Sequence, residues 1–314
     1  MAGSTIGTNQ HYVPQALLRG FIFDENREQI FTFDKQTRRS FPTTIRNIAA
    51  ERDFYTVAGS DVLDQSMNRA DGLAAPVLRM IREEKNLRLL NAMDLGVLAG
   101  FAGLQMLRTR NMLEQWRDMG IQFADRFARM GDELPNGFED IRDPERAREG
   151  FLAAIPQQAV TMMRSLLNKH ILLLESDGSL PFWLSDNPIT KNNTLNEGDG
   201  LVGTLGLEVP GIEVYLPVSS QITVAFMSPL VTAAYLEVDT QARRMGFISP
   251  DAHEYLRAQR TGRPMKLSRD NVRFQNSLQV HNSERWVFSF EDSFADAVEM
   301  VEGGILGGPR LTMN

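Results

Sequence analysis

Apolar residues in the middle of the chain recur at the spacing of an amphipathic helix. Between Leu63 and Ile81 they fall near every third or fourth position, with polar residues in between. The pattern predicts a helix over residues 61–90, in which Pro76 marks a kink or a boundary.

The stretch from 93 to 108 is almost wholly apolar and also predicts a helix. Its glycines at 96, 100 and 103 recur at close to helical spacing, which is typical of a buried helix packed tightly against a neighbour. The run is too short, and too closely flanked by charge, for a membrane span. Further helical patterns cover residues 116–130 and 145–168.

Alternating and short apolar runs on both sides of this region predict strands. Residues 29–34 alternate, and residues 39–43 follow them after a short loop, as in a β-hairpin. Other expected strands are 54–57, 171–175, 182–185, 212–217, 221–226, 230–236 and 285–289. Helices are expected over 270–281, with Ser268 as N-cap, and over 294–301; residues 192–211 form a long Gly/Asn-rich loop.

These patterns predict an α+β fold in one domain over residues 1–302. A small β-rich amino-terminal unit (1–60) leads into a helical middle (61–170) and then into a predominantly β carboxy-terminal half (171–302). Residues 303–314 form a Gly/Pro tail that we expect to be loose.

The amino-acid composition limits the classes of function that this protein can have. The 314 residues carry a formal net charge of −7 without a block of Lys and Arg, which argues against a general duplex-binding surface but leaves a local basic cleft open. The absence of cysteine excludes disulfides, cysteine zinc sites and thiol nucleophiles. The first residues lack the pattern of a secretory signal, and no apolar run reaches membrane-spanning length, so we expect a cytoplasmic protein without membrane partners.

The stretch from His11 to Gln15 is the most distinctive on the chain. Pro14 pushes Val13 toward extended geometry and suits the first turn of a helix, so His11 sits on a stiff segment beside a helix start. Imidazole titrates near neutral pH, and His11 could therefore be an acid or base, or a phosphate or metal contact. The alternative, which the sequence alone favours, is a buried histidine bonded to a backbone carbonyl.

Other polar residues stand at the ends of predicted elements or inside apolar ones. Arg108 lies in an apolar helix and needs a partner, for which Asp186 is one candidate. Gln105 lies one turn before Arg108 on the same face. If these groups converge with Glu51, they suit phosphodiester or nucleotide hydrolysis. His11 would be the general acid or base and Arg108 would neutralise charge; Asp186 or Glu51 would orient the imidazole or hold a divalent metal ion.

The ligand-binding candidates in this hypothesis are Gln15, Gln105, Asn187 and Ser219. The alternative is a non-catalytic binding or regulatory module, because Asp186, Asn187 and Pro188 form an ordinary turn sequence and Arg108 with Asp186 could be a structural pair. Ser185 and Ser219 lack nucleophile-elbow glycines, and no phosphate-binding or dinucleotide motif is present. The other three histidines, at 170, 253 and 281, have no metal-type spacing.

The stretch His11-Tyr12-Val13-Pro14-Gln15, followed by Phe21, resembles the start of a widespread, mainly bacterial domain family of unknown function with an amino-terminal His-x-Val-Pro-Gln signature. Further pieces resemble that family in the same order: Asp34-Lys35, Phe54-Tyr55, residues 105–110, residues 185–188, residues 217–219, Asn276 and residues 285–289. The likeness covers roughly residues 9–290 and departs at Val218, where leucine is usual. It implies no established activity. Only the bacterial setting, and nothing in the residues, suggests a nuclease-like effector in defence or a toxin.

Overall fold

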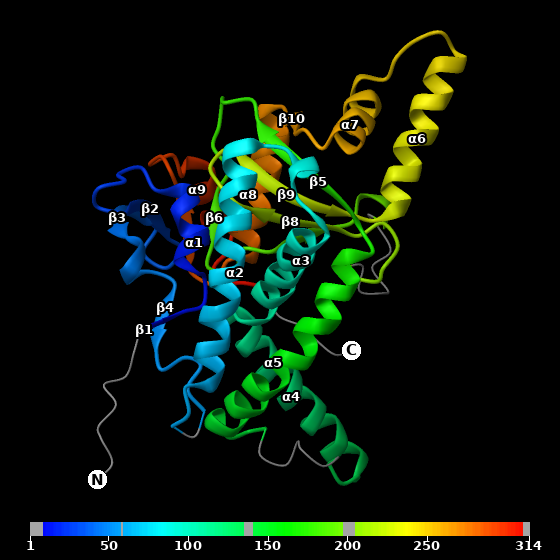
Figure 1. Cartoon of the computed structure of the whole chain (residues 1–314). Helices are drawn as coiled ribbons and strands as arrows, with labels where there is room; N and C mark the ends of the chain where they lie inside the picture. The colour runs from blue at the N-terminus through cyan, green and yellow to red at the C-terminus, as the bar shows by residue number, and fades with distance from the viewer. Residues whose placement is uncertain (1–8, 58, 135–140, 197–204, 310–314) are drawn as a thin grey trace.

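The computed structural model describes residues 9–57, 59–134, 141–196 and 205–309. Within those ranges, nine α-helices and eleven strands in three sheets form a mixed α+β structure, as the sequence predicts (Figure 1).

The predicted hairpin near the amino terminus is confirmed. Strand β2 (Gln29–Asp34) pairs antiparallel with β3 (Arg39–Thr44). The same β2 pairs on its other side with β11 (Trp286–Ser289), which in turn pairs with β6 (Leu184–Ser185). The resulting order β3-β2-β11-β6 joins the two ends of the chain in one sheet, so the carboxy-terminal half completes the amino-terminal unit.

A second, two-stranded sheet carries the His11 segment. Strand β1 (Asn9–His11) pairs antiparallel with β4 (Ala50–Arg52), so that His11 stands opposite Ala50. The strand predicted over residues 54–57 is wrong: the chain turns there, directly after β4.

Four long helices make up the middle of the chain, as predicted. They are α2 (Val62–Glu84), α3 (Ala92–Leu107), α4 (Arg110–Met130) and α5 (Pro144–Leu167). Polar side chains cap three of them at the amino end: Asn91 for α3, Thr109 for α4 and Asp143 for α5.

Helix α3 packs tightly against α5, and one of its three glycines allows this. A Cβ added at Gly103 would lie 2.9 Å from the backbone nitrogen of Met163 on α5. A Cβ added at Gly96 would meet nothing within 4 Å. The predicted close packing therefore rests on Gly103, and Gly96 has no part in it.

The largest sheet has the order β10-β5-β9-β8-β7. Its strands are β5 (His170–Ser176), β7 (Thr190–Asn192), β8 (Glu213–Pro217), β9 (Ile222–Met227) and β10 (Met265–Leu267). Side chains alternate between its two faces. Leu173, Leu216 and Val224 enter the main hydrophobic core with α2 and α3, whereas Leu172 and Ala225 enter a second core.

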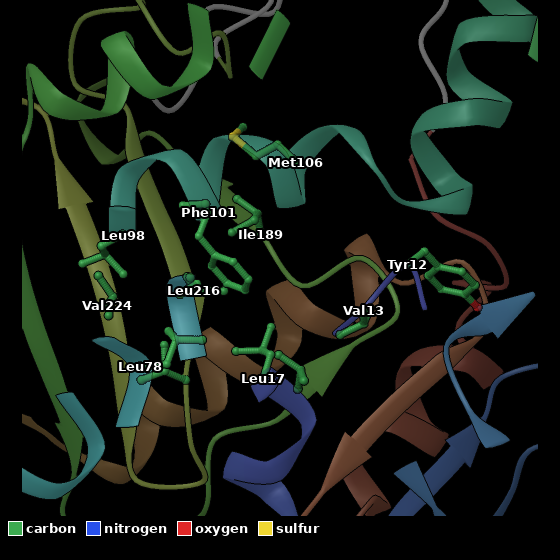
Figure 2. Close-up of a cluster of buried hydrophobic side chains, with 14 of the residues drawn as sticks. Tyr12, Val13, Leu17, Leu78, Leu98, Phe101, Met106, Ile189, Leu216 and Val224 are labelled. Carbon is green, nitrogen blue, oxygen red and sulfur yellow. The ribbon is translucent and has the colours of Figure 1, made fainter. Parts of the chain in front are cut away.

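The main core includes the short helix α1 (Gln15–Leu18), which follows Pro14 as the sequence predicts. Leu17 is fully buried in this core with Leu78, Phe101 and Leu216 (Figure 2). The apolar residues after His11 thus anchor the segment in the centre of the molecule.

The second core is covered by helices that the sequence patterns partly missed. Residues 230–236, predicted as a strand, belong to α6 (Pro229–Arg244). The Ser228 hydroxyl accepts from the Leu230 amide and Pro229 occupies the first turn, and together they start a helix. The helix α7 (Pro250–Thr261) was not predicted. The predicted helices at the end are confirmed as α8 (Arg269–Asn282), with Ser268 as N-cap, and α9 (Ala295–Glu302).

The described part of the tail, residues 303–309, contacts the rest of the chain. The Lys35 ammonium lies 3.5 Å from the Gly307 carbonyl, and the Asn111 amide lies 3.5 Å from the Pro309 carbonyl. Ile305 packs against the core that contains Phe33. Residues 310–314 and part of the predicted 192–211 loop lie outside the described residues.

Among the described helices, none combines the length and the apolar character needed to cross a membrane.

Candidate functional site

The segment after β1 sends consecutive side chains to different places. The amides of Tyr12 and Val13 both donate to the Ala49 carbonyl, over 3.0 and 3.3 Å, which holds the chain extended before Pro14. His11 and Tyr12 then line two different cavities, and Val13 is buried in the core. The strand alternation of this stretch therefore separates His11 from Tyr12.

His11 lines a cavity of about 480 Å³, called here the histidine cavity. Its walls come mainly from β1, α1 and α2, and its polar lining residues include Gln10, Gln15, Arg19, Tyr55, Asp64, Asn68 and Asp71. Gln15, one of the predicted ligand-binding residues, is therefore placed beside His11. Its side-chain oxygen accepts a long hydrogen bond of 3.4 Å from Arg19.

One ring nitrogen of His11 is committed to the backbone. Nε2 lies 3.0 Å from the Ile45 carbonyl oxygen, and because a carbonyl only accepts, Nε2 carries a proton. In neutral imidazole the lone pair is then on Nδ1, which bonds to no other described residue. Burial lowers the pKa of His11, and the Ile45 hydrogen bond and the charge of Asp71 oppose this. A backbone carbonyl therefore satisfies one ring nitrogen, and the ring also lines a cavity; a catalytic or ligand-binding role of His11 stays a prediction.

Arg108 pairs with Asp71, not with Asp186. The Arg108 side chain is fully buried, and its Nη2 lies 2.7 Å from Oδ1 of Asp71 on α2. The contact is ionic, without the alignment of a hydrogen bond, and Nη1 bonds to no described residue. Asp71 keeps 19% of its side-chain surface exposed and lines the histidine cavity. Arg108 thus stands behind the cavity wall and reaches it only through Asp71.

Gln105 supports this arrangement from one turn away, as its spacing predicts. Its oxygen accepts from Arg108 Nε over 2.7 Å, and its nitrogen donates to the Tyr12 carbonyl over 2.8 Å. The Tyr55 hydroxyl donates to the carbonyl of Arg108, 3.1 Å away. These bonds tie the end of α3 to the His11 segment, and they use both functional groups of Gln105.

Asp186 serves the backbone at the start of β11. Its two carboxylate oxygens accept from the amides of Glu284, Arg285 and Trp286 at 2.8 to 2.9 Å. Burial raises the pKa of Asp186 to about 6, although these three amide bonds act in the opposite direction. The turn interpretation of Asp186 therefore matches its contacts.

Asn187 and Ser219 are likewise bonded within the fold. Asn187 accepts from the Thr109 hydroxyl and donates to the side chain of Asn111 and the carbonyl of Asn282. Ser219 accepts from the amides of Gln221 and Ile222 in the turn before β9. Neither residue lines the histidine cavity.

Glu51 and Asp186 meet in a second cavity of about 330 Å³, which Tyr12, Arg110 and Arg285 also line. Glu51 pairs with Arg110 at 2.7 Å. Arg285 forms two hydrogen bonds to Asp34 and lies 4.1 Å from the ring centroid of Trp286. The predicted catalytic residues are thus divided: His11 in one cavity, Glu51 and Asp186 in another, and Arg108 between elements in the core.

Asp64 and Asp71 were missed by the sequence reasoning. Both lie on α2 and face the histidine cavity with Asn68, which donates to Asp64 over 3.0 Å. Burial raises the pKa of Asp64, the Asn68 bond opposes it, and the charges of Asp61 and Asp71 add to the rise. The signal was present in the sequence, because positions 64, 68 and 71 fall on one face of the predicted helix.

A divalent metal ion was one expected cofactor. Across the described ranges, no three His, Asp or Glu side chains lie close enough together to hold a metal ion. His11, Asp64 and Asp71 line one cavity without forming such a group.

A family model matches residues 9–293, nearly the whole of the described structure. The chain belongs to the family described as protein of unknown function (DUF4238). Comparison with curated proteins and with solved structures gave no match. The family assignment agrees with the resemblance seen in the sequence, in that the family has no known activity.

Proposed function

We propose that this domain is a ligand-binding module whose site is the histidine cavity. The ligand class we infer is a small molecule that presents several O–H or N–H groups and carries no negative charge. The observation that carries the proposal is the charge of the cavity wall. Asp64 and Asp71 line it, the lining Arg19 is paired with Glu28 at 3.0 Å, and Arg108 is sealed behind Asp71.

The hydrogen-bonding groups of the cavity support this ligand class. Carboxylate oxygens of Asp64 and Asp71 only accept, and neutral His11 offers the Nδ1 lone pair as a further acceptor. A ligand with donor groups satisfies them, whereas an anion meets two carboxylates. The volume of about 480 Å³ falls in the range of small-molecule sites.

The test uses two matched pairs of probes, ribose with ribose 5-phosphate and adenosine with its 5′-monophosphate. Binding to the full chain is measured by calorimetry, and the His11 ring signals are followed by NMR. We expect the uncharged member of a pair to bind and to shift the His11 signals, and Asp64→Asn to weaken it. Tighter binding of the phosphorylated members would contradict the proposal. Asp118→Asn, on helix α4, is the matched change outside this cavity.

A second candidate is the hydrolase that the sequence suggested, and one observation favours it. The Ile45 carbonyl fixes the Nε2 proton of His11 and burial lowers the pKa of the ring, so Nδ1 is available as a general base near neutral pH. A phosphodiester or nucleotide substrate would bring negative charge beside Asp64 and Asp71, so a divalent cation would have to accompany it.

That candidate is tested by turnover of bis(p-nitrophenyl) phosphate with Mg²⁺ or Mn²⁺. We expect His11→Ala to abolish any activity and His281→Ala, an exposed histidine, to retain it. Equal rates for the two variants would remove His11 from the mechanism. A nuclease-like role in bacterial defence or as a toxin depends on this activity and stays a prediction. The His-x-Val-Pro-Gln signature of the family and its bacterial distribution also stay predictions.

A further inference from the structure

A separate cavity of about 270 Å³ lies among the residues of the second core. It is on the face of the five-stranded sheet opposite to the one that packs in the main core. Glu213, on β8, lines this cavity and lies between Asn192 on β7 and Met227 on β9 in the strand register. Helices α6, α7 and α8 each contribute to the walls; the lining residues include Tyr215, Tyr235, Tyr255, Met265, Phe274 and Gln275. It shares no residue with the histidine cavity.

Glu213 is a buried carboxylate whose described hydrogen-bond partners are all neutral. It is 5% exposed and accepts hydrogen bonds from the Thr194 hydroxyl at 2.8 Å, from the Tyr215 hydroxyl, and from the Asn192 amide at 3.4 Å. All three donors are neutral. Over the part of the chain that the structure describes, no Lys, Arg or His side chain forms an ion pair with Glu213. A buried carboxylate left without a counter-charge is costly, so this position favours a cation.

The walls of the cavity suit an organic cation. Tyr235 and Tyr255 stack on each other with ring centroids 4.1 Å apart, and Phe274 is 43% exposed on α8. Burial raises the pKa of Tyr255 to about 12, and the charge of Glu213 adds to this, so the hydroxyl stays neutral. Aromatic faces attract ammonium groups, so these rings suit an alkylated nitrogen beside the carboxylate.

We propose that the Glu213 cavity binds a small organic ammonium ion, with Glu213 as its counter-charge and the tyrosine rings as its walls. The volume of about 270 Å³ is at the lower limit for ligand sites, so the ligand has few heavy atoms beyond the ammonium group. The proposal is independent of the function of the histidine cavity.

The decisive comparison is between choline and 3,3-dimethylbutan-1-ol, which have the same shape and differ by the charge on the central atom. Binding to the full chain is measured by calorimetry and by thermal shift, with ethanolamine and tetramethylammonium as further cations. We expect at least one of the three cations to bind, and choline to bind more tightly than its neutral isostere. Equal binding of choline and the alcohol, or no binding by any of the three cations, would overturn the proposal.

Two variants test whether the cation binds in this cavity. Glu213→Gln keeps the acceptor for Thr194 and removes the charge, and it should weaken cation binding at least about tenfold. The matched control is Glu237→Gln, which removes one exposed carboxylate from α6. Phe274→Ala at a partly exposed position should weaken binding by about threefold, and it decides the matter if Glu213→Gln does not fold. Unchanged affinity in both Glu213→Gln and Phe274→Ala would contradict the assignment.

Discussion

Asp71 on α2 and Arg108, the residue that follows α3, form an ion pair with 2.7 Å between Oδ1 and Nη2 and with the arginine wholly buried. The pair links the wall of the histidine cavity to the end of α3. Gln105 and the carbonyl of Tyr12 extend the connection to the His11 segment. The position of one cavity carboxylate thus depends on a residue that the ligand cannot touch.

Asp71→Asn should destabilise the fold strongly. It leaves the Arg108 guanidinium buried without a counter-charge, which costs about 3 kcal/mol of unfolding free energy. Urea denaturation measures the loss. Glu51→Gln breaks the exposed pair with Arg110 and serves as the control, with an expected loss below about 1 kcal/mol. If the two variants lose equal stability, the buried pair has no special role.

The double variant Asp71→Leu with Arg108→Leu should recover part of that loss. Replacing both charges removes the uncompensated group, and the leucines fill an environment that Phe101 already makes apolar. A double variant as unstable as the sum of the two single changes would show that the residues act independently.

His11 should titrate below its usual pKa, with the proton of the neutral ring on Nε2. Nitrogen NMR of the ring reports both properties. Because the unfolded chain takes up the proton at higher pH, this group stabilises the fold above pH 6.5, and the contribution is lost as pH falls through the folded pKa. The pH dependence should be absent in His11→Gln. A neutral ring with its proton on Nδ1 would contradict the hydrogen bond to Ile45.

Asp186 should change the stability of the fold with pH in the opposite direction to His11. Its pKa is raised from 3.8 to about 6, so the folded state holds the proton more tightly than the unfolded state. The contribution is fully present below pH 3.8 and is lost as pH rises through about 6. The change amounts to at most about 3 kcal/mol. Denaturation of the protein and of Asp186→Asn between pH 4 and 7 measures it, and parallel stability curves would refute a raised pKa.

Gly103→Ala should destabilise the contact between α3 and α5 by about 1 to 3 kcal/mol, because the new methyl group meets the Met163 backbone at 2.9 Å. Gly96→Ala on the same helix meets nothing within 4 Å and should stabilise it by up to about 1 kcal/mol. Thermal unfolding of the two variants distinguishes packing from helix propensity. A stabilised Gly103→Ala would mean that the two helices can separate at no cost.

Local sequence patterns correctly predicted the elements whose secondary structure is determined within a few residues. The apolar spacing from Leu63 to Ile81 and the Ser268 cap act within a few residues, and α2 and α8 formed where expected. The strand predicted over residues 230–236 was wrong because the aliphatic and aromatic residues of this run suit a strand as well as a helix face. The preceding Ser228 and Pro229 were the better evidence.

The candidate site was harder to predict because its contacts join distant parts of the chain. The sequence required a partner for buried Arg108, and one exists, but Asp71 lies on another helix and no local rule selects it over Asp186. The polar residues of the motifs looked catalytic because they stand at element ends. The backbone at those ends needs hydrogen bonds, and Asp186 and Asn187 supply them.

The insertion of β11 between β2 and β6 has a consequence for biosynthesis. While the chain is being translated, β2 can pair with β3 but its other edge stays open until residues 286–289 leave the ribosome. The Lys35 ammonium likewise lacks its acceptors, the carbonyls of Val280 and Ser283, until those residues are made. The nascent amino-terminal hairpin therefore presents an unpaired strand edge to chaperones and proteases until residues 286–289 are made, and a ribosome that stalls before residue 286 leaves a product that cannot close this sheet.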